Sequence, residues 1–264
     1  MFEKINALLN EGNNSLNKNR IVIEKNSILK SLIKKELAMY FSIPIYVTNT
    51  IIGPAIILLG GLATIFFKKE EILRVLNINF PEEFTLILVI GFLIAIISLS
   101  CTTNSSISLE GKNLWILKSL PLRTIDIFKG KIILNLILVI PITIIASIIF
   151  KFTLGYSFLE LIYIVVISSI YATIIAILGI IANVFLPRLN WTSATQVVKQ
   201  SFSVLLVMLA SLVIIGIPVI AIIKFNIINI NRIIFISIIY LLIILVSSLI
   251  VLKYMAIKRY ELIN

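Results

Sequence analysis

Six long apolar segments divide this sequence, and they constrain its fold more than any other feature. Four of them contain no charged residue, and the charges in the other two, Glu82, Glu83 and Glu160, fall in the first turn. A helix needs about 20 consecutive apolar residues to cross a bilayer. The segments are therefore predicted to be transmembrane helices, with approximate bounds 44–67, 81–101, 132–150, 159–185, 202–223 and 233–252.

The composition of the whole chain supports this prediction. Of the 264 residues, 60% are hydrophobic and 13% are charged, and the mean hydropathy is +1.13. Soluble domains carry roughly 45–50% apolar and about 25% charged residues. The excess apolar surface must face lipid, so the predicted fold class is all-α: a polytopic membrane helix bundle of about six transmembrane helices.

Two regions are predicted. Residues 1–26 form a flexible polar leader that is too polar for a signal peptide, and residues 27–264 form the transmembrane domain. The domain is expected to open with an amphipathic interfacial helix, capped by Asn26 or Ser27 and running to about Phe41. Glu36 falls on the apolar side of that helix and spoils its pattern. The apolar flank otherwise consists of Ile28, Leu29, Leu32, Ile33 and Tyr40.

The distribution of Lys and Arg predicts the orientation. With the N-terminus inside, the cytoplasmic segments are 1–42, 103–131, 186–200 and 253–264, and they hold 17 of the 23 basic residues. Cytoplasmic segments are enriched in Lys and Arg, so both termini are predicted to lie inside. The net charge of +11 is then explained by topology and does not indicate a nucleic-acid partner.

This orientation predicts a labelling pattern in intact cells. After Cys101 is replaced, single cysteines at Asn113 and Ser193 should resist a membrane-impermeant thiol reagent, because both lie in predicted cytoplasmic loops. A cysteine at Asn77, in a predicted outer loop, should react. Labelling of position 113 from outside would overturn the orientation.

The sequence lacks the residue types that the common classes of membrane-embedded hydrolase use for catalysis. It has no histidine, one cysteine and one aspartate, Asp126, which argues against metallo-, serine- and aspartyl-type catalysis and against a metal or other cofactor. A phosphate-binding loop is also absent, because Ser106 and Ile125 stand where that motif requires glycine before Gly111 and Gly130. Any ATP hydrolysis must therefore come from another polypeptide.

Two predicted cytoplasmic loops contain more than a connection needs. In the first, the uncharged polar run 98–108 is followed by Glu110, Gly111 and Lys112, and Thr124 is expected to cap the third span. A short apolar helix between them is far too short to cross a membrane and should lie under the bilayer. It comprises Leu114, Trp115, Leu117, Lys118 and Leu120, and Pro121 ends it.

The second loop contains Arg188, Trp191 and Lys199, and Thr192 is expected to cap a helix that continues into the fifth span. Trp115 and Trp191 are the two tryptophans of the chain. Tryptophan commonly lies at the membrane interface, but it is also frequent where proteins dock. The residues alone leave both interpretations open.

Three stretches resemble a known family. Residues 107–122, ISLEGKNLWILKSLPL, are similar to the cytoplasmic loop of a family of ATP-binding-cassette (ABC) exporter permeases from Gram-positive bacteria. LIKKELAMYFSIPIYVTNTIIGP (32–54) resembles the lead-in and first span of that family's C-terminal half, and PRLNWTSATQVVKQS (187–201) resembles its second cytoplasmic loop.

The resemblance implies a function for the first loop. In such exporters a short helix between the second and third spans docks in a groove of a cytoplasmic ATPase and transmits nucleotide-driven closure to the membrane domain. Leu114, Trp115 and Leu117 would then pack against the ATPase. Glu110, Lys112 and Lys118 would set the register through charge, and Gly111 would allow the turn.

The resemblance also implies a bacterial cell membrane location and a second permease half, or a second copy of this chain, as partner. Relatives are expected to be about twice as long and to carry acidic residues at 192–195, where this chain has Thr, Ser, Ala and Thr. The transported substrate is not readable from the spans. A membrane scaffold or sensor that transports nothing is the alternative function.

Overall fold

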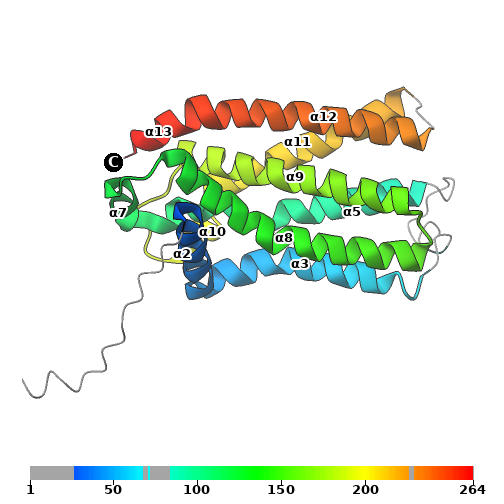
Figure 1. Cartoon of the computed structure of the whole chain (residues 1–264), viewed down its shortest axis with the longest axis horizontal. Helices are drawn as coiled ribbons and strands as arrows, with labels where there is room; N and C mark the ends of the chain where they lie inside the picture. The colour runs from blue at the N-terminus through cyan, green and yellow to red at the C-terminus, as the bar shows by residue number, and fades with distance from the viewer. Residues whose placement is uncertain (1–26, 68–70, 72–83, 226–228, 264) are drawn as a thin grey trace, which may run out of the picture.

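The computed structural model of the chain describes residues 27–67, 71, 84–225 and 229–263. Within these ranges the regular structure is helical and includes no strand. Six helices are long and apolar enough to cross a membrane, and they run side by side as a bundle (Figure 1). The predicted all-α polytopic bundle is confirmed. The leader 1–26 and Asn77 lie outside the described residues.

The long helices follow the predicted segments closely, although the third is longer than expected and begins eight residues earlier. Pro54, Pro141 and Pro218 do not interrupt α3, α8 and α11, because each lies inside its helix. The six are α3 (Pro44–Ala63), α5 (Thr85–Leu99), α8 (Thr124–Leu154), α9 (Phe158–Phe185), α11 (Phe202–Lys224) and α12 (Ile230–Val251).

Most short elements gather at one end of the bundle, called here the α7 end (Figure 1). The first and last described residues also lie at this end, as expected if both termini are on one side of the membrane. The short elements are α2 (Ile28–Ser42), α6 (Thr103–Ser106), the 3-10 helix η2 (Ser108–Asn113), α7 (Leu114–Ser119), α10 (Ala194–Val198), the π-helical turn η3 (Leu252–Ala256) and α13 (Ile257–Glu261).

Helix α9 is the centre of the bundle. It packs against α5, α6, α8, α11 and α12. In its most apolar stretch 61% of residues are buried, against 17% for α11 and 22% for α12. The outer faces of α11 and α12 therefore remain apolar and exposed, which is the arrangement expected for helices that face lipid.

The predicted amphipathic helix is α2, and Ser27 caps it by accepting a hydrogen bond from the Lys30 amide at 3.4 Å. It lies across α8 instead of alongside the spanning helices (Figure 1). Leu32, Glu36 and Tyr40 repeat every four residues and form its buried stripe. Glu36, which spoiled the apolar pattern, thus belongs to the face that packs inward.

The expected caps were partly wrong. Thr124 is the first residue of α8, and the cap position before it is Arg123, without a side-chain cap bond. Thr192 does not cap a continuous helix either, because α10 starts after Ser193 and ends at Val198, before α11 begins. Glu160 lies in the first turn of α9 as predicted and forms a reciprocal capping box with Ser157.

Candidate functional site

Helix α7 has one exposed and one buried face at the end of the bundle. Trp115, Ile116 and Leu120 have exposed fractions of 66%, 46% and 46%. Leu114 and Leu117 are buried in an apolar cluster formed with α8, η3 and α13. Of the three residues expected to pack against an ATPase, only Trp115 therefore lies on the exposed face. Pro121 follows the end of α7 as predicted.

Lys118 connects α7 to the C-terminal segment. Its Nζ donates hydrogen bonds to the backbone carbonyls of Glu261, at 3.1 Å, and of Ile263. The same Nζ lies 5.7 Å from the centroid of the Tyr260 ring, within range of a cation–π contact. The charge of Lys118 thus holds α7 against α13, whereas Lys112 is exposed.

Gly111 and Trp191 hold the two loops together. Gly111 has φ +54°, a region that favours glycine, so the turn before α7 requires this residue. A Cβ at this position would lie 3.0 Å from Trp191 Nε1. That nitrogen donates to the Ser108 carbonyl at 2.8 Å. The indole of the second loop therefore packs on the turn of the first, and Trp191 has an internal structural contact that Trp115 does not have.

The rest of the second loop is also tied to the first. The backbone N–H of Arg188 donates to Ser108 Oγ at 2.9 Å. The Arg188 guanidinium donates to the carbonyl oxygen of Gln196 at 3.3 Å and to its Oε1 at 3.4 Å, which fixes α10 beside the loop. Lys199 is exposed at the end of α10.

A compact cluster of four ionised side chains lies behind α7. Lys131 Nζ of α8 donates to Glu36 Oε1 at 2.9 Å and to Glu110 Oε1 at 2.7 Å. It also donates to the Ser106 carbonyl at 3.1 Å. Lys35 Nζ pairs with Glu36 at 3.1 Å and with Glu110. We call Lys35, Glu36, Glu110 and Lys131 the ion cluster.

The ion cluster is buried and has no net charge. The side chains of Lys131, Glu36 and Glu110 are exposed by 0%, 1% and 7%, and Lys35 closes the cluster from the surface at 35%. Charges removed from water at this depth require partners at close range. The cluster therefore fixes the position of η2, and so of the adjoining α7, relative to α2 and α8.

The uncharged polar run 98–108 is not a loop exposed to water but a buried part of the bundle. Asn183 of α9, fully buried, accepts hydrogen bonds at Oδ1 from the backbone N–H groups of Ile107 (2.8 Å) and Ser108 (2.9 Å). Its amide nitrogen donates to Ser108 Oγ at 2.7 Å and to Ser203 Oγ at 3.2 Å. One side chain therefore satisfies two buried backbone donors of the connection to α7.

Asn135 and Gly179 fix the same run from two other sides. Asn135 Oδ1 of α8 accepts hydrogen bonds from the backbone N–H of Thr102 at 2.8 Å and from its hydroxyl at 3.0 Å. A Cβ on Gly179 of α9 would lie 2.1 Å from Thr103 Oγ1 and 2.9 Å from the Asn104 backbone nitrogen. The missing side chain at 179 is therefore what allows α6 to lie directly against α9.

The described residues offer no metal site. Within 27–67, 71, 84–225 and 229–263 no group of three or more His, Cys, Asp or Glu side chains lies close enough to hold a metal ion. The carboxylates that approach one another, Glu36 and Glu110, are already paired with lysines. The arrangement at the α7 end is that of a rigidly supported surface.

These features define the class of the protein: a multi-pass, α-helical membrane protein with a short, partly exposed helix fixed at one end of its bundle. Comparison with protein-family models, with curated proteins and with solved structures finds no match to this chain.

Sequence reasoning missed three residues that hold this end together. Lys131 was counted as a cation of a cytoplasmic loop, although it is buried inside α8. Asn135 and Asn183 lie within two of the predicted spans and were not singled out from the sequence. A signal for the asparagines was present, because an amide in an otherwise apolar span needs a hydrogen-bonding partner, and the run 98–108 supplied one.

Proposed function

We propose that this chain is the transmembrane permease subunit of an ABC exporter in a bacterial cell membrane. A separate cytoplasmic ATPase would hydrolyse ATP and dock on α7, and a second permease half or a second copy of this chain would complete the transporter. The proposal is supported by the resemblance of residues 107–122 to the coupling loop of such permeases, together with the exposed face of α7.

The observation that carries the proposal is the combination of exposure and rigid support at α7. Trp115 is a large aromatic side chain, 66% exposed, on a helix whose opposite face is buried. Tryptophan in such a position is the residue type most often responsible for binding energy at protein interfaces. An exposed tryptophan on a mobile loop could bind an ATPase, but it would not transmit movement of the ATPase to the membrane helices.

The contacts behind α7 give a route from a docked ATPase to the membrane helices. A force on α7 acts on η2, where Glu110 is held by Lys131 of α8 and by Lys35 of α2. It also acts on Ser108, which Asn183 of α9 holds by hydrogen bonds. Helices α8 and α9 cross the bundle from end to end (Figure 1). Movement of the ATPase would thus shift several spans together.

Interfacial anchoring is the competing role for Trp115, and it would suit a membrane scaffold or sensor equally well. The two roles predict different neighbours for the indole: protein for docking and lipid for anchoring. Photocrosslinking from position 115 separates them, because the reagent records what is within contact distance in the native membrane.

We expect benzoylphenylalanine at position 115 to crosslink to a polypeptide that carries a phosphate-binding loop. We also expect Trp115→Ala to reduce recovery of that polypeptide with the purified chain, by about thirtyfold in affinity, because losing a buried aromatic at an interface costs about 2 kcal/mol. The measurements are mass spectrometry of the crosslinked product and ATPase activity of the material purified in mild detergent.

Phe202 provides the matched control, since it is an aromatic residue of similar exposure (77%) that is not on α7. Phe202→Ala should leave ATPase recovery unchanged. Trp191→Ala is unsuitable as a control, because it removes the hydrogen bond to Ser108 and the contact with Gly111. Crosslinks from position 115 to lipid alone, with equal ATPase recovery from Trp115→Ala, would reject the proposal.

A further inference from the structure

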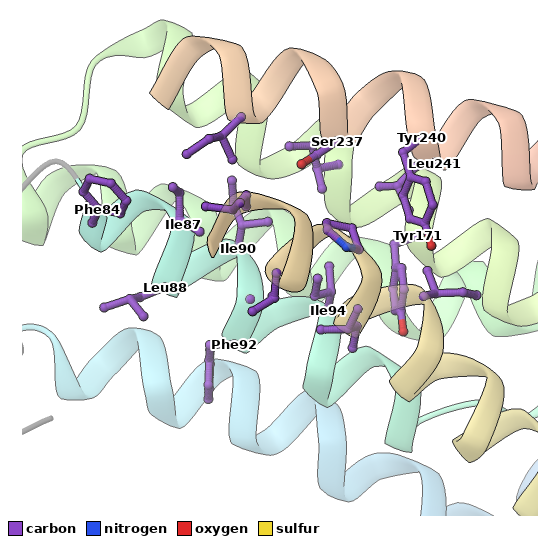
Figure 2. A pocket seen from close by; sticks show the side chains of 18 residues that line it. Phe84, Ile87, Leu88, Ile90, Phe92, Ile94, Tyr171, Ser237, Tyr240 and Leu241 are labelled. Atoms are coloured by element: carbon purple, nitrogen blue, oxygen red, sulfur yellow. The ribbon is translucent and has the colours of Figure 1, made fainter. Parts of the chain in front are cut away.

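A cavity of about 450 Å³ lies among α5, α9, α11 and α12, on the side of the bundle away from α3. Figure 2 shows that it is elongated, with Phe84 at one end and Tyr171 and Tyr240 at the other. Phe84 directly precedes α5, at the end of the bundle opposite α7. The cavity therefore extends from the middle of the bundle toward the end remote from the ion cluster.

The lining is almost entirely hydrocarbon. Among the 18 lining residues none is charged, and the only side-chain polar groups are the hydroxyls of Tyr171, Tyr240 and Ser237. The Tyr171 hydroxyl is already hydrogen-bonded to Ser98 Oγ at 2.6 Å. A charged or strongly polar molecule would lose its hydration here without gaining partners. The walls select an uncharged, apolar occupant.

The cavity also reaches the outer surface of the bundle. Val219 of α11, which lines it, is 48% exposed, so the cavity is partly open to the outside of the bundle at this residue. Gly91 of α5 and Pro218 of α11 lie in the lining, and a Cβ on Gly91 would meet no atom within 4 Å. A flexible chain can therefore enter sideways from the bilayer without crossing a polar barrier.

We propose that this cavity binds one acyl chain of a membrane phospholipid, with the headgroup remaining outside the bundle. An apolar cavity of roughly 150 Å³ stays dry and holds one benzene, so about 450 Å³ has room for a chain of roughly 18 carbon atoms. Burial of each methylene against these walls favours binding. The inference does not depend on the exporter proposal, since it concerns the spans alone.

The test uses the full chain reconstituted in phosphatidylcholine vesicles that contain a phosphatidylcholine with a diazirine at the end of one acyl chain. After illumination, we expect crosslinks on Ile90 of α5 and Ile214 of α11, which line the cavity. Each of these side chains is 8% exposed, whereas Leu212 on the outer face of α11 is 66% exposed, so lipid outside the bundle labels mainly the outer face.

Gly91→Leu should reduce that labelling at least roughly tenfold, because the leucine side chain takes the place of about four chain carbons. Gly216→Leu is the matched control: a Cβ on this glycine of α11 also meets nothing within 4 Å, but Gly216 is not in the cavity lining. It should leave labelling unchanged. Ser237→Phe repeats the filling from α12 in case Gly91→Leu does not fold.

Gel filtration and the thermal unfolding midpoint of each variant identify any that fail to fold. Crosslinks confined to the exposed faces of α11 and α12 would overturn the proposal. Equal labelling of Ile90 and Ile214 in wild type and in a folded cavity-filling variant would also overturn it. Neither result would bear on ATPase docking, which is measured at the other end of the bundle.

Discussion

Replacing Lys131 with methionine is expected to lower the thermal unfolding midpoint of the purified protein by roughly 6–20 °C. Among the described residues, the substitution leaves Lys35 as the only cation paired with Glu36 and Glu110, two carboxylates that are nearly fully buried. Breaking a buried ion pair by removing one partner costs about 3–5 kcal/mol, and 1 kcal/mol corresponds to about 2–4 °C in a chain of this size. Thermal unfolding in detergent, followed by gel filtration, measures the shift.

Two further variants make this prediction specific. Lys129→Met removes an exposed lysine two residues away on the same helix and should shift the midpoint little. The double variant Lys131→Met/Glu36→Gln restores the balance of one lysine and one glutamate and should recover part of the loss. If Lys131→Met unfolds at the wild-type temperature, the ion cluster does not support the α7 end as described.

Asn183→Leu should destabilise the protein by about 2–6 kcal/mol. Leucine has nearly the same size, but it leaves the backbone N–H groups of Ile107 and Ser108 buried without the acceptor that holds them at 2.8 and 2.9 Å. Each unsatisfied buried donor costs about 1–3 kcal/mol. The thermal unfolding midpoint reports the loss of stability, and protease cleavage within residues 98–113 reports loosening of this connection.

Asn190→Leu is the matched control, because Asn190 is exposed in the loop between α9 and α10. It should unfold at the wild-type temperature, since an exposed amide already has water as a partner. Protection of residues 98–113 in Asn183→Leu equal to that of the wild type would show that the hydrogen bonds to Asn183 are not needed to hold the run in place.

The positions of the long helices were predictable because the signal is local. A span is a run of apolar residues of sufficient length, and its ends carry prolines, charges or capping residues in the same stretch of sequence. Ser157 and Glu160 illustrate this, since they are three residues apart and form the capping box by themselves. Where the local signal was ambiguous, at Thr124 and Thr192, the predicted cap was wrong.

The candidate site was predictable only in part. The sequence located α7 and the turn at Gly111, because a short apolar segment between a glycine and a proline is a local pattern. Which face of α7 is exposed was not predictable from the sequence. Leu114, Trp115, Ile116 and Leu117 are all apolar, so four of the six residues of this helix do not distinguish a polar face from an apolar one. The packing of α7 on α8 and α13 buries Leu114 and Leu117 and leaves the opposite face exposed.

By itself, the sequence determined that this protein is a bundle of six membrane-crossing helices preceded by an amphipathic helix. A helix that crosses lipid must be apolar over about 20 consecutive residues, and such a run can be recognised directly in the sequence. Only the tertiary structure decided the pairing of the polar residues. Glu36 meets Lys131 across 95 positions of sequence, and Asn183 meets Ser108 across 75. A buried charge or amide needs its partner at about 3 Å, and the chain brings such partners together only when its helices pack.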